Sequence, residues 1–154
     1  MKKYLEKQAV FNSTLRVFAF FSKRSFFNGL TQFLTTRSAK LNLVLNKPKP
    51  VSQLNELAQS WQAMMPPDGQ EYFKIKDTSE DTAYTEIHLH CPLRGTGNVE
   101  ACYKLMNYDR QLMNAVGGQL IVLESQSNSG KNYCRLAIRE KQKDASDLVP
   151  AHKK

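Results

Sequence analysis

The sequence has little of what would mark an unusual class of protein. Its 154 residues include three cysteines, seven glycines and six prolines, too few for a disulfide-rich scaffold or a collagen-like chain. No run of about 18 uninterrupted apolar residues occurs, so no membrane-spanning helix is expected. The apolar run Val17 to Phe21 is too short for a secretory signal. The composition predicts one globular domain, and the odd number of cysteines favours reduced thiols and a cytoplasmic protein.

Acidic residues are almost absent from the first third of the chain. Residues 1–50 hold ten lysines and arginines but only one acidic residue, Glu6, whereas the remainder holds 12 basic and 13 acidic residues. Because a nucleic-acid-binding domain would keep its basic residues on the folded module, we expect no nucleic-acid partner. Seven of the eight phenylalanines also lie between Val10 and Leu34. This stretch fits a helical pair packed on the rest of the chain or on a second copy, a helix on an anionic membrane, or an organellar presequence.

The pattern of apolar residues divides the chain into four parts. Residues 1–47 are expected to form a basic, Phe-rich helical arm, with a break at Asn28-Gly29. Residues 48–51 form an extended linker, because a residue before proline disfavours the helical conformation. Residues 52–140 form an α+β ligand-binding domain, and residues 141–154 form a polar tail that is expected to fray.

Within residues 52–140 the periodicity changes from helical to alternating and back. Ser52 is the expected N-cap of a helix that Pro66-Pro67 ends. A stripe with spacings of three and four predicts one helix over 98–116, capped by Asn98 and ended by Gly117. Alternating runs predict strands over 71–76, 83–91, 119–125 and 132–139. The order strand-strand-helix-strand-strand predicts an α+β fold with an antiparallel sheet backed by helices.

One acidic residue interrupts the apolar stripe of the predicted helix over 98–116. Asp109 falls on the same face as Cys102 and Val116. A buried carboxylate is normally paired, so Asp109 could contact Arg94 or Arg135, or cap backbone amides. The alternative is a carboxylate that faces a ligand cavity as an acid, a base or a hydrogen-bond acceptor.

The three cysteines come from three different predicted elements. Cys91 ends a strand, Cys102 lies in the first turns of a helix, and Cys134 lies on the last strand. They could be small core residues, or Cys91 and Cys102 could be thiols activated by a cation or a helix N-terminus. With His88 and His90 they offer the atom types that zinc prefers, but the spacing matches no compact zinc motif. We therefore expect no metal ligands and no cofactor.

The segment Arg94-Gly95-Thr96-Gly97-Asn98 precedes the long predicted helix. Backbone amides at a helix N-terminus attract anions, so Arg94, Thr96 and Asn98 are candidates for binding a carboxylate or phosphate of a substrate. The glycine spacings of known phosphate-binding loops are absent. A flexible connection is the simpler interpretation of the segment.

The segment 84–139 resembles a known family. It contains, in order, Cys91-Pro92, Gly97, Cys102, Asp109, Gly117-Gly118, Gly130 and Cys134. This pattern resembles the L-2-amino-thiazoline-4-carboxylic acid hydrolase-like family and, more remotely, the 4-vinyl reductase domain of hydrocarbon-binding proteins. The resemblance implies a dimeric α+β domain with a pocket between sheet and helices, where Cys91, Cys102, Asp109 and Cys134 act. In the hydrolase family the reaction adds water and opens a thiazoline ring.

These features predict a small-molecule-binding α+β protein and leave its activity open. A hydrolase of a cyclic amidine or amide-like bond would use Cys91 or Cys102 as nucleophile, Asp109 as acid or base, and Arg94 as the anchor of a substrate carboxylate. The alternatives are a non-catalytic ligand sensor or carrier and a thiol-based zinc or redox module. The expected partners are a small molecule, a second copy of the chain in a homodimer, and a membrane surface contacted through residues 10–34.

Overall fold

The computed structural model describes the backbone of residues 2–154 and the side chains from Lys7 onward. Helices α1 (Lys2–Ser22) and α2 (Asn28–Asn46) come first, joined by a 3₁₀ turn, Ser25–Phe27. Helix α3 (Leu54–Ala63) and a second 3₁₀ turn (Pro67–Tyr72) lead to strands β1 (Phe73–Thr78) and β2 (Ala83–Ile87). Then follow α4 (Val99–Leu105), α5 (Asn107–Val116), β3 (Gly118–Glu124), β4 (Cys134–Glu140) and the C-terminal turn (Ala151–Lys153).

The four strands form one antiparallel sheet in the order β1-β2-β4-β3. The predicted α+β fold with an antiparallel sheet and helices packed against it is confirmed. Alternate residues of each strand face the helices, as the pleat requires; Leu120 of β3, Ile138 of β4 and Ala83 of β2 pair in one buried row. Strand β3 lies at an edge of the sheet, so one side of its backbone is free for other partners.

Large apolar side chains fill the space between the sheet and the helices. Trp61 of α3 is fully buried and meets Phe73 of β1 in a T-shaped contact with ring centroids 5.8 Å apart. Phe11 of α1 packs on the same Phe73 ring at 6.1 Å. Leu112 and Met113 of α5 are also fully buried. The N-terminal helix therefore contributes to the core that backs the sheet.

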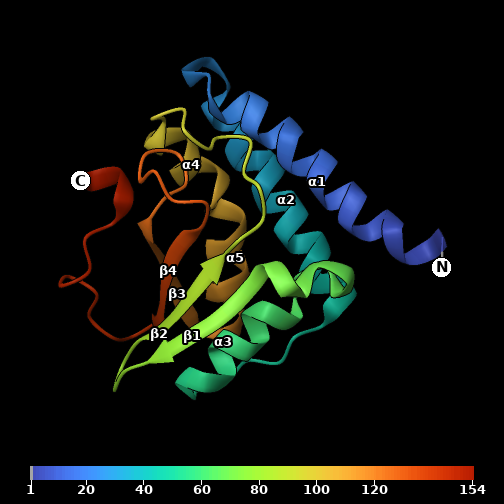
Figure 1. Cartoon of the computed structure of the whole chain (residues 1–154). Helices are drawn as coiled ribbons and strands as arrows, with labels where there is room; N and C mark the ends of the chain where they lie inside the picture. Colours follow the sequence, from blue (N-terminus) through green and yellow to red (C-terminus); the bar gives the residue numbers. More distant parts are fainter. Residues whose placement is uncertain (1) are drawn as a thin grey trace.

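Helices α1 and α2 form an outer layer on one side of the molecule, with the sheet and the C-terminal tail on the other side (Figure 1). Small side chains of α2, among them Thr35 and Ala39, are buried against the inner helices. Asn107 of α5 donates a hydrogen bond to Thr35 at 2.9 Å, and Asn42 of α2 donates one to the Tyr108 hydroxyl at 2.7 Å. The helical pair thus packs on the rest of the chain.

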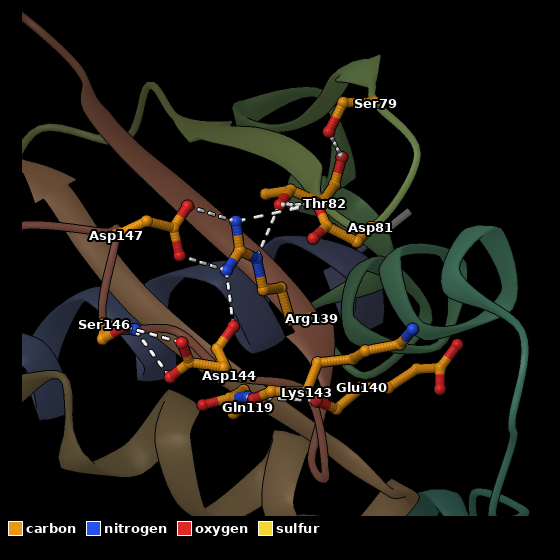
Figure 2. Close-up of polar contacts among 10 residues, drawn as sticks. All are labelled: Ser79, Asp81, Thr82, Gln119, Arg139, Glu140, Lys143, Asp144, Ser146 and Asp147. Atoms are coloured by element: carbon orange, nitrogen blue, oxygen red, sulfur yellow. Dashed lines mark hydrogen bonds and ion pairs between the residues drawn. The ribbon is translucent and has the colours of Figure 1, made fainter.

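The polar tail was expected to fray, and this expectation is wrong. Arg139 of β4 is buried and donates hydrogen bonds to the Asp147 carboxylate, the Asp144 carbonyl oxygen and the Thr82 hydroxyl (Figure 2). Beyond this cluster, Ala151 is buried against the body of the protein. A buried guanidinium has five donors to satisfy, and the tail supplies most of the acceptors, with Thr82 supplying another.

Several predicted boundaries need correction. The predicted strand over 83–91 ends at Ile87, and the predicted helix over 98–116 is interrupted at Met106. Helix α3 begins after Gln53, which makes no side-chain cap, and not after Ser52. The arm breaks before Asn28, in the Ser25–Phe27 turn, and not at Asn28-Gly29.

Other boundary predictions are confirmed. The Asn98 side chain accepts a hydrogen bond from the Ala101 amide at 2.9 Å and so caps α4. Gly117 ends α5 with a φ of 97°, a conformation that favours glycine. A Cβ at Gly117 would also lie 2.9 Å from the Val51 carbonyl oxygen. Among the helices in the described part of the chain, none is both long and apolar enough to cross a membrane.

Candidate functional site

A cavity of about 230 Å³ lies where helices α4 and α5, edge strand β3 and the C-terminal turn meet. Each wall comes from a different part of the sequence, and the tail forms one of them. The apolar wall consists of Val99, Leu120, Ile121, Val122, Pro150 and Ala151. The remaining lining residues are Cys102, Tyr103, Arg110, His152 and Lys153. The cavity is therefore apolar along the sheet, and all of its polar lining residues come from α4, α5 and the tail.

Three side chains stack along the polar side of the cavity. The His152 ring lies 3.9 Å from the Tyr103 ring, measured between centroids. The Arg110 guanidinium lies 4.0 Å from the centroid of the same Tyr103 ring and donates a hydrogen bond to the Tyr103 carbonyl oxygen at 2.7 Å. The Lys154 ammonium donates to the Leu123 carbonyl oxygen at 2.8 Å. These contacts hold the tail against α4 and the free edge of β3.

The lining of the cavity carries positive charge. Arg110 and Lys153 are cationic, and none of the lining residues is acidic. Burial lowers the pKa of the His152 imidazole, so this ring is mainly neutral at pH 7. Burial also lowers the pKa of Arg110, but an arginine stays protonated across the physiological range. The cavity thus favours an anionic group beside an apolar one.

Cys102 is the only one of the four predicted catalytic residues that lines this cavity. Burial raises the pKa of its thiol to about 11, although a hydrogen bond with Ser125 acts in the opposite direction. A nucleophilic cysteine needs a lowered pKa, because the thiolate is the reactive form. At neutral pH Cys102 is therefore a protonated, weakly polar wall of the cavity.

Cys91 and Cys134 lie near Cys102 but outside the cavity lining. Burial raises the pKa of Cys134 to about 12, and the neighbouring thiols Cys102 and Cys91 add to the rise. Burial also raises the pKa of Cys91, whose sulfur accepts a hydrogen bond from the Leu93 amide at 3.4 Å. All three cysteines are free. The structure thus brings the three predicted cysteines into one region as protonated thiols.

The histidines and cysteines whose atom types suit zinc do not converge on one point. His88 contacts the Glu86 carboxylate at 2.7 Å and stacks on Tyr133, while His90 is exposed. Over the described residues, no group of three or more histidine, cysteine, aspartate and glutamate side chains is arranged to hold a metal ion.

Asp109 is buried in the first turn of α5, only 8% exposed, and faces α3 and not the cavity. The Trp61 indole donates a hydrogen bond to its Oδ1 at 3.0 Å. The two partners that the sequence suggested are engaged elsewhere, since Arg94 contacts Gln126 and Arg135 lies over the Tyr84 ring. Burial raises the pKa of the Asp109 carboxyl to about 6, and the Trp61 hydrogen bond opposes the rise.

The three predicted substrate-binding residues stabilise the loop before α4. Arg94 donates hydrogen bonds to the Gln126 side chain at 2.7 Å and to the Asn132 carbonyl oxygen at 3.0 Å. The Thr96 hydroxyl donates to the Leu93 carbonyl oxygen, and Asn98 caps the helix. The loop amides of Gly95 and Gly97 donate to the backbone of residues 126 and 127. These groups are therefore already engaged within the fold.

The Gln126 side chain organises this loop, and sequence reasoning missed it. Gln126 is 1% exposed; its Oε1 accepts from the Cys91 amide and Arg94, and its Nε2 donates to the carbonyl oxygens of Ile87 and Leu89. A glutamine in a polar loop between two strands gave no signal of this role. This buried amide thus satisfies backbone groups of residues 87–91, where the chain leaves the sheet.

Comparison of the chain with protein-family models, with curated proteins and with solved structures finds no match. The geometry of the cavity therefore carries the functional argument.

Sequence reasoning also missed the cationic side of the cavity. Arg110 directly follows Asp109 and so falls outside the apolar stripe, which includes Asp109. His152 lies in the tail that was expected to fray. Only the folded position of the tail places His152 beside Tyr103.

Proposed function

We propose that the protein binds a small carboxylate with a compact apolar ring, as a ligand carrier or sensor. The observation that carries this proposal is the lining of the cavity, which combines an apolar wall on β3 with cationic Arg110 and Lys153 and contains no acidic residue. An arginine guanidinium matches the planar geometry of a carboxylate. The carboxylate of the ligand would pair with Arg110 and Lys153, while the ring of the ligand contacts Leu120 and Val122.

The size of the cavity supports a single-ring ligand. Its volume is about 230 Å³. A cavity of about 150 Å³ accommodates benzene, and sites for drug-sized molecules begin at about 300 Å³. The resemblance of residues 84–139 to a hydrolase-like family would also imply a small cyclic carboxylate, although the thiazoline ring itself is polar.

Binding is better supported than hydrolysis. Opening a thiazoline ring requires an activated nucleophile or an activated water near the ring. Burial keeps the Cys102 thiol protonated, and Asp109, the predicted acid or base, contacts Trp61 outside the cavity lining. The zinc alternative lacks support, because no group of side chains among the described residues is arranged to bind a metal ion.

The test uses benzoate as the carboxylate probe and benzyl alcohol as its neutral counterpart. We expect benzoate to bind the full chain at pH 7, observed by calorimetry, and benzyl alcohol to bind more weakly. Arg110→Met should weaken benzoate binding at least about tenfold, because a charge-assisted hydrogen bond is lost. Lys153→Met removes the other cationic group of the lining, and because Lys153 is exposed we expect this variant to fold.

The matched control is Arg135→Met, which removes an arginine from β4 outside the cavity and should leave benzoate binding unchanged. Native mass spectrometry of the protein, purified without added ligand, should also reveal a bound organic anion. Benzoate that fails to bind the native chain, or that binds both cavity variants as tightly as the native chain, would overturn the proposal.

A further inference from the structure

The outer surface of α1 and α2 exposes apolar side chains to an unusual degree. Of the eleven large apolar residues that are exposed among the described side chains, nine lie between Val10 and Leu45. Phe26, in the turn between the helices, is 90% exposed, and Phe33 and Val44 of α2 are more than half exposed. Isolated exposed apolar residues are normal, but such a concentration marks an interaction surface.

Basic residues share this surface, and acidic residues are missing from it. The exposed basic residues between residues 7 and 49 are Lys7, Arg16, Lys23, Arg24, Arg37, Lys40, Lys47 and Lys49. The sequence has no aspartate or glutamate between Glu6 and Glu56. We call the exposed apolar and basic side chains of residues 7–49 the N-terminal face. The rest of the chain has nearly balanced charge, so the excess positive charge of the protein lies in the segment that forms this face.

The basic and apolar groups are interleaved at close range. The Arg24 guanidinium lies 3.9 Å from the Phe20 ring centroid, and the Arg37 guanidinium lies 5.2 Å from the Phe33 ring centroid. Phe33, Arg37 and Lys40 also line a shallow depression on α2. A partner that touches the apolar groups must therefore accept positive charge at the same place.

We propose that the N-terminal face docks on the surface of an anionic lipid bilayer. Aromatic and aliphatic side chains would enter the boundary between headgroups and acyl chains, while the basic side chains contact the lipid phosphates and carboxylates. The helices lie on the bilayer in this arrangement and do not cross it. The proposal is independent of the ligand proposed for the cavity.

Two other occupants fit the face less well. A symmetric dimer would place the face against itself, so that arginines and lysines would meet one another with no acidic residue to neutralise them. A nucleic acid would neutralise the charge, but it would gain nothing from the exposed Leu41, Val44 and Leu45. A lipid surface satisfies both kinds of side chain at once.

The test measures flotation of the full chain with vesicles of phosphatidylcholine alone or mixed with phosphatidylserine. We expect strong binding only to the mixed vesicles, with release as the salt concentration rises. The triple variant Arg24→Gln, Arg37→Gln, Lys40→Gln should bind about a hundredfold more weakly, since each basic residue near the surface contributes to attraction. The triple variant Phe26→Ser, Phe33→Ser, Val44→Ser should also lose binding.

The matched control removes three exposed basic residues elsewhere, with Lys74→Gln, Lys141→Gln and Lys143→Gln, and should bind like the native chain. All substituted residues are exposed, and circular dichroism verifies that each variant folds. Equal binding to the two kinds of vesicle, or no binding to either, would overturn the proposal. So would a dimer of the native chain that the serine variant abolishes, or charge-dependent binding to nucleic acid but not to vesicles.

Discussion

Arg139 and Asp147 form a bidentate ion pair, in which the two terminal guanidinium nitrogens lie 2.5 and 2.7 Å from the two carboxylate oxygens. The pair joins the end of β4 to the tail that forms one wall of the cavity. The Arg139 Nε also donates to the Thr82 hydroxyl, so the tail is tied to the sheet through a buried side chain. The ion pair thus helps to hold the tail, with His152 and Lys153, beside the cavity.

We predict that Asp147→Asn loosens the tail. Without the carboxylate, the Arg139 guanidinium loses its strongest acceptor, and trypsin should cleave after Lys141 and Lys143 several-fold faster than in the native chain. Benzoate binding should weaken in parallel, because Lys153 leaves the cavity. Glu80→Gln, an equivalent change on an exposed loop residue, should alter neither property.

The same pair gives the tail a pH dependence of defined sign. Arg139 holds the pKa of Asp147 below its ordinary value. A carboxyl whose pKa is lowered by folding stabilises the folded tail above its ordinary pKa, and this contribution is lost as the pH falls through the folded pKa. Trypsin is inactive in acid, so the tail is followed by amide hydrogen exchange instead. After correction for the intrinsic pH dependence of exchange, the exchange rates of residues 142–153 should rise as the pH falls below 4. Asp147→Asn should weaken this acid transition and leave the part that comes from Asp144, whose pKa is lowered by its hydrogen bonds with Ser146.

We predict that Asp109→Asn stabilises the protein at neutral pH. Burial raises the pKa of Asp109 from 3.8 to about 6, so ionising the carboxylate above pH 6 costs about 2 to 3 kcal/mol of folding free energy. An asparagine keeps the acceptor for the Trp61 indole without the charge. Urea unfolding at pH 7.5 should show the variant more stable by about this amount.

The advantage of the Asp109→Asn variant should shrink between pH 6 and pH 4, because the folded state there binds more protons than the unfolded state. Below pH 4 the two proteins should be nearly equal. Asp77→Asn, on an exposed residue, serves as the control for the substitution itself. A native chain that is more stable than Asp109→Asn at pH 7.5 would mean that the carboxylate has a charged partner.

Periodicity predicted the sheet and the buried side of helix 98–116, but not where these elements end. The apolar stripe from Cys102 through Met106 to Val116 continues in phase across the break at Met106. No glycine or proline lies at the break, so the sequence has no local signal for it. The alternation of Ile87 and Leu89 with histidines likewise continues past Ile87, where strand β2 ends, so it gives no signal of the strand end.

The cavity is formed by residues that are far apart in the sequence, and residue spacing along the chain does not reveal such long-range contacts. Sequence spacing selected Cys102, and the cavity indeed includes it. It also selected Asp109, whose partner proved to be Trp61, 48 positions earlier in the chain. Arg110 and His152 meet at Tyr103, and the tail that carries His152 is anchored by Arg139 and Lys154. Local patterns therefore identified the helix that bears the cavity but not the residues that give it charge.

We predict that Gln126→Ala destabilises the protein by about 2 to 4 kcal/mol, since it leaves the buried carbonyl oxygen of Leu89 and the half-buried amide of Cys91 without partners. Amide exchange should accelerate most strongly over residues 88–97. Gln142→Ala removes an exposed glutamine and should change the free energy of unfolding by less than about 0.5 kcal/mol. Equal effects of the two substitutions would contradict the organising role of Gln126.

The reactivity of the thiols distinguishes a binding cavity from a catalytic one. Burial raises the pKa of Cys102 from 9.0 to about 11, so at neutral pH its thiolate fraction is about a hundredfold below that of an ordinary cysteine. We predict slow alkylation of Cys102 by iodoacetamide, with a rate that rises steadily up to pH 9. Cys91, which is half-buried, should react before Cys102 and Cys134.

Peptide mapping by mass spectrometry measures the three rates in one sample, and Cys91→Ala isolates the slower pair. A rate for Cys102 that levels off near pH 7 would reveal a thiolate stabilised by its surroundings. In that case the Cys102 thiolate could attack the ring of a bound ligand, and hydrolysis would again be a supported function. A rate that keeps rising leaves Cys102 as a wall of a binding cavity, because a protonated thiol cannot start the reaction.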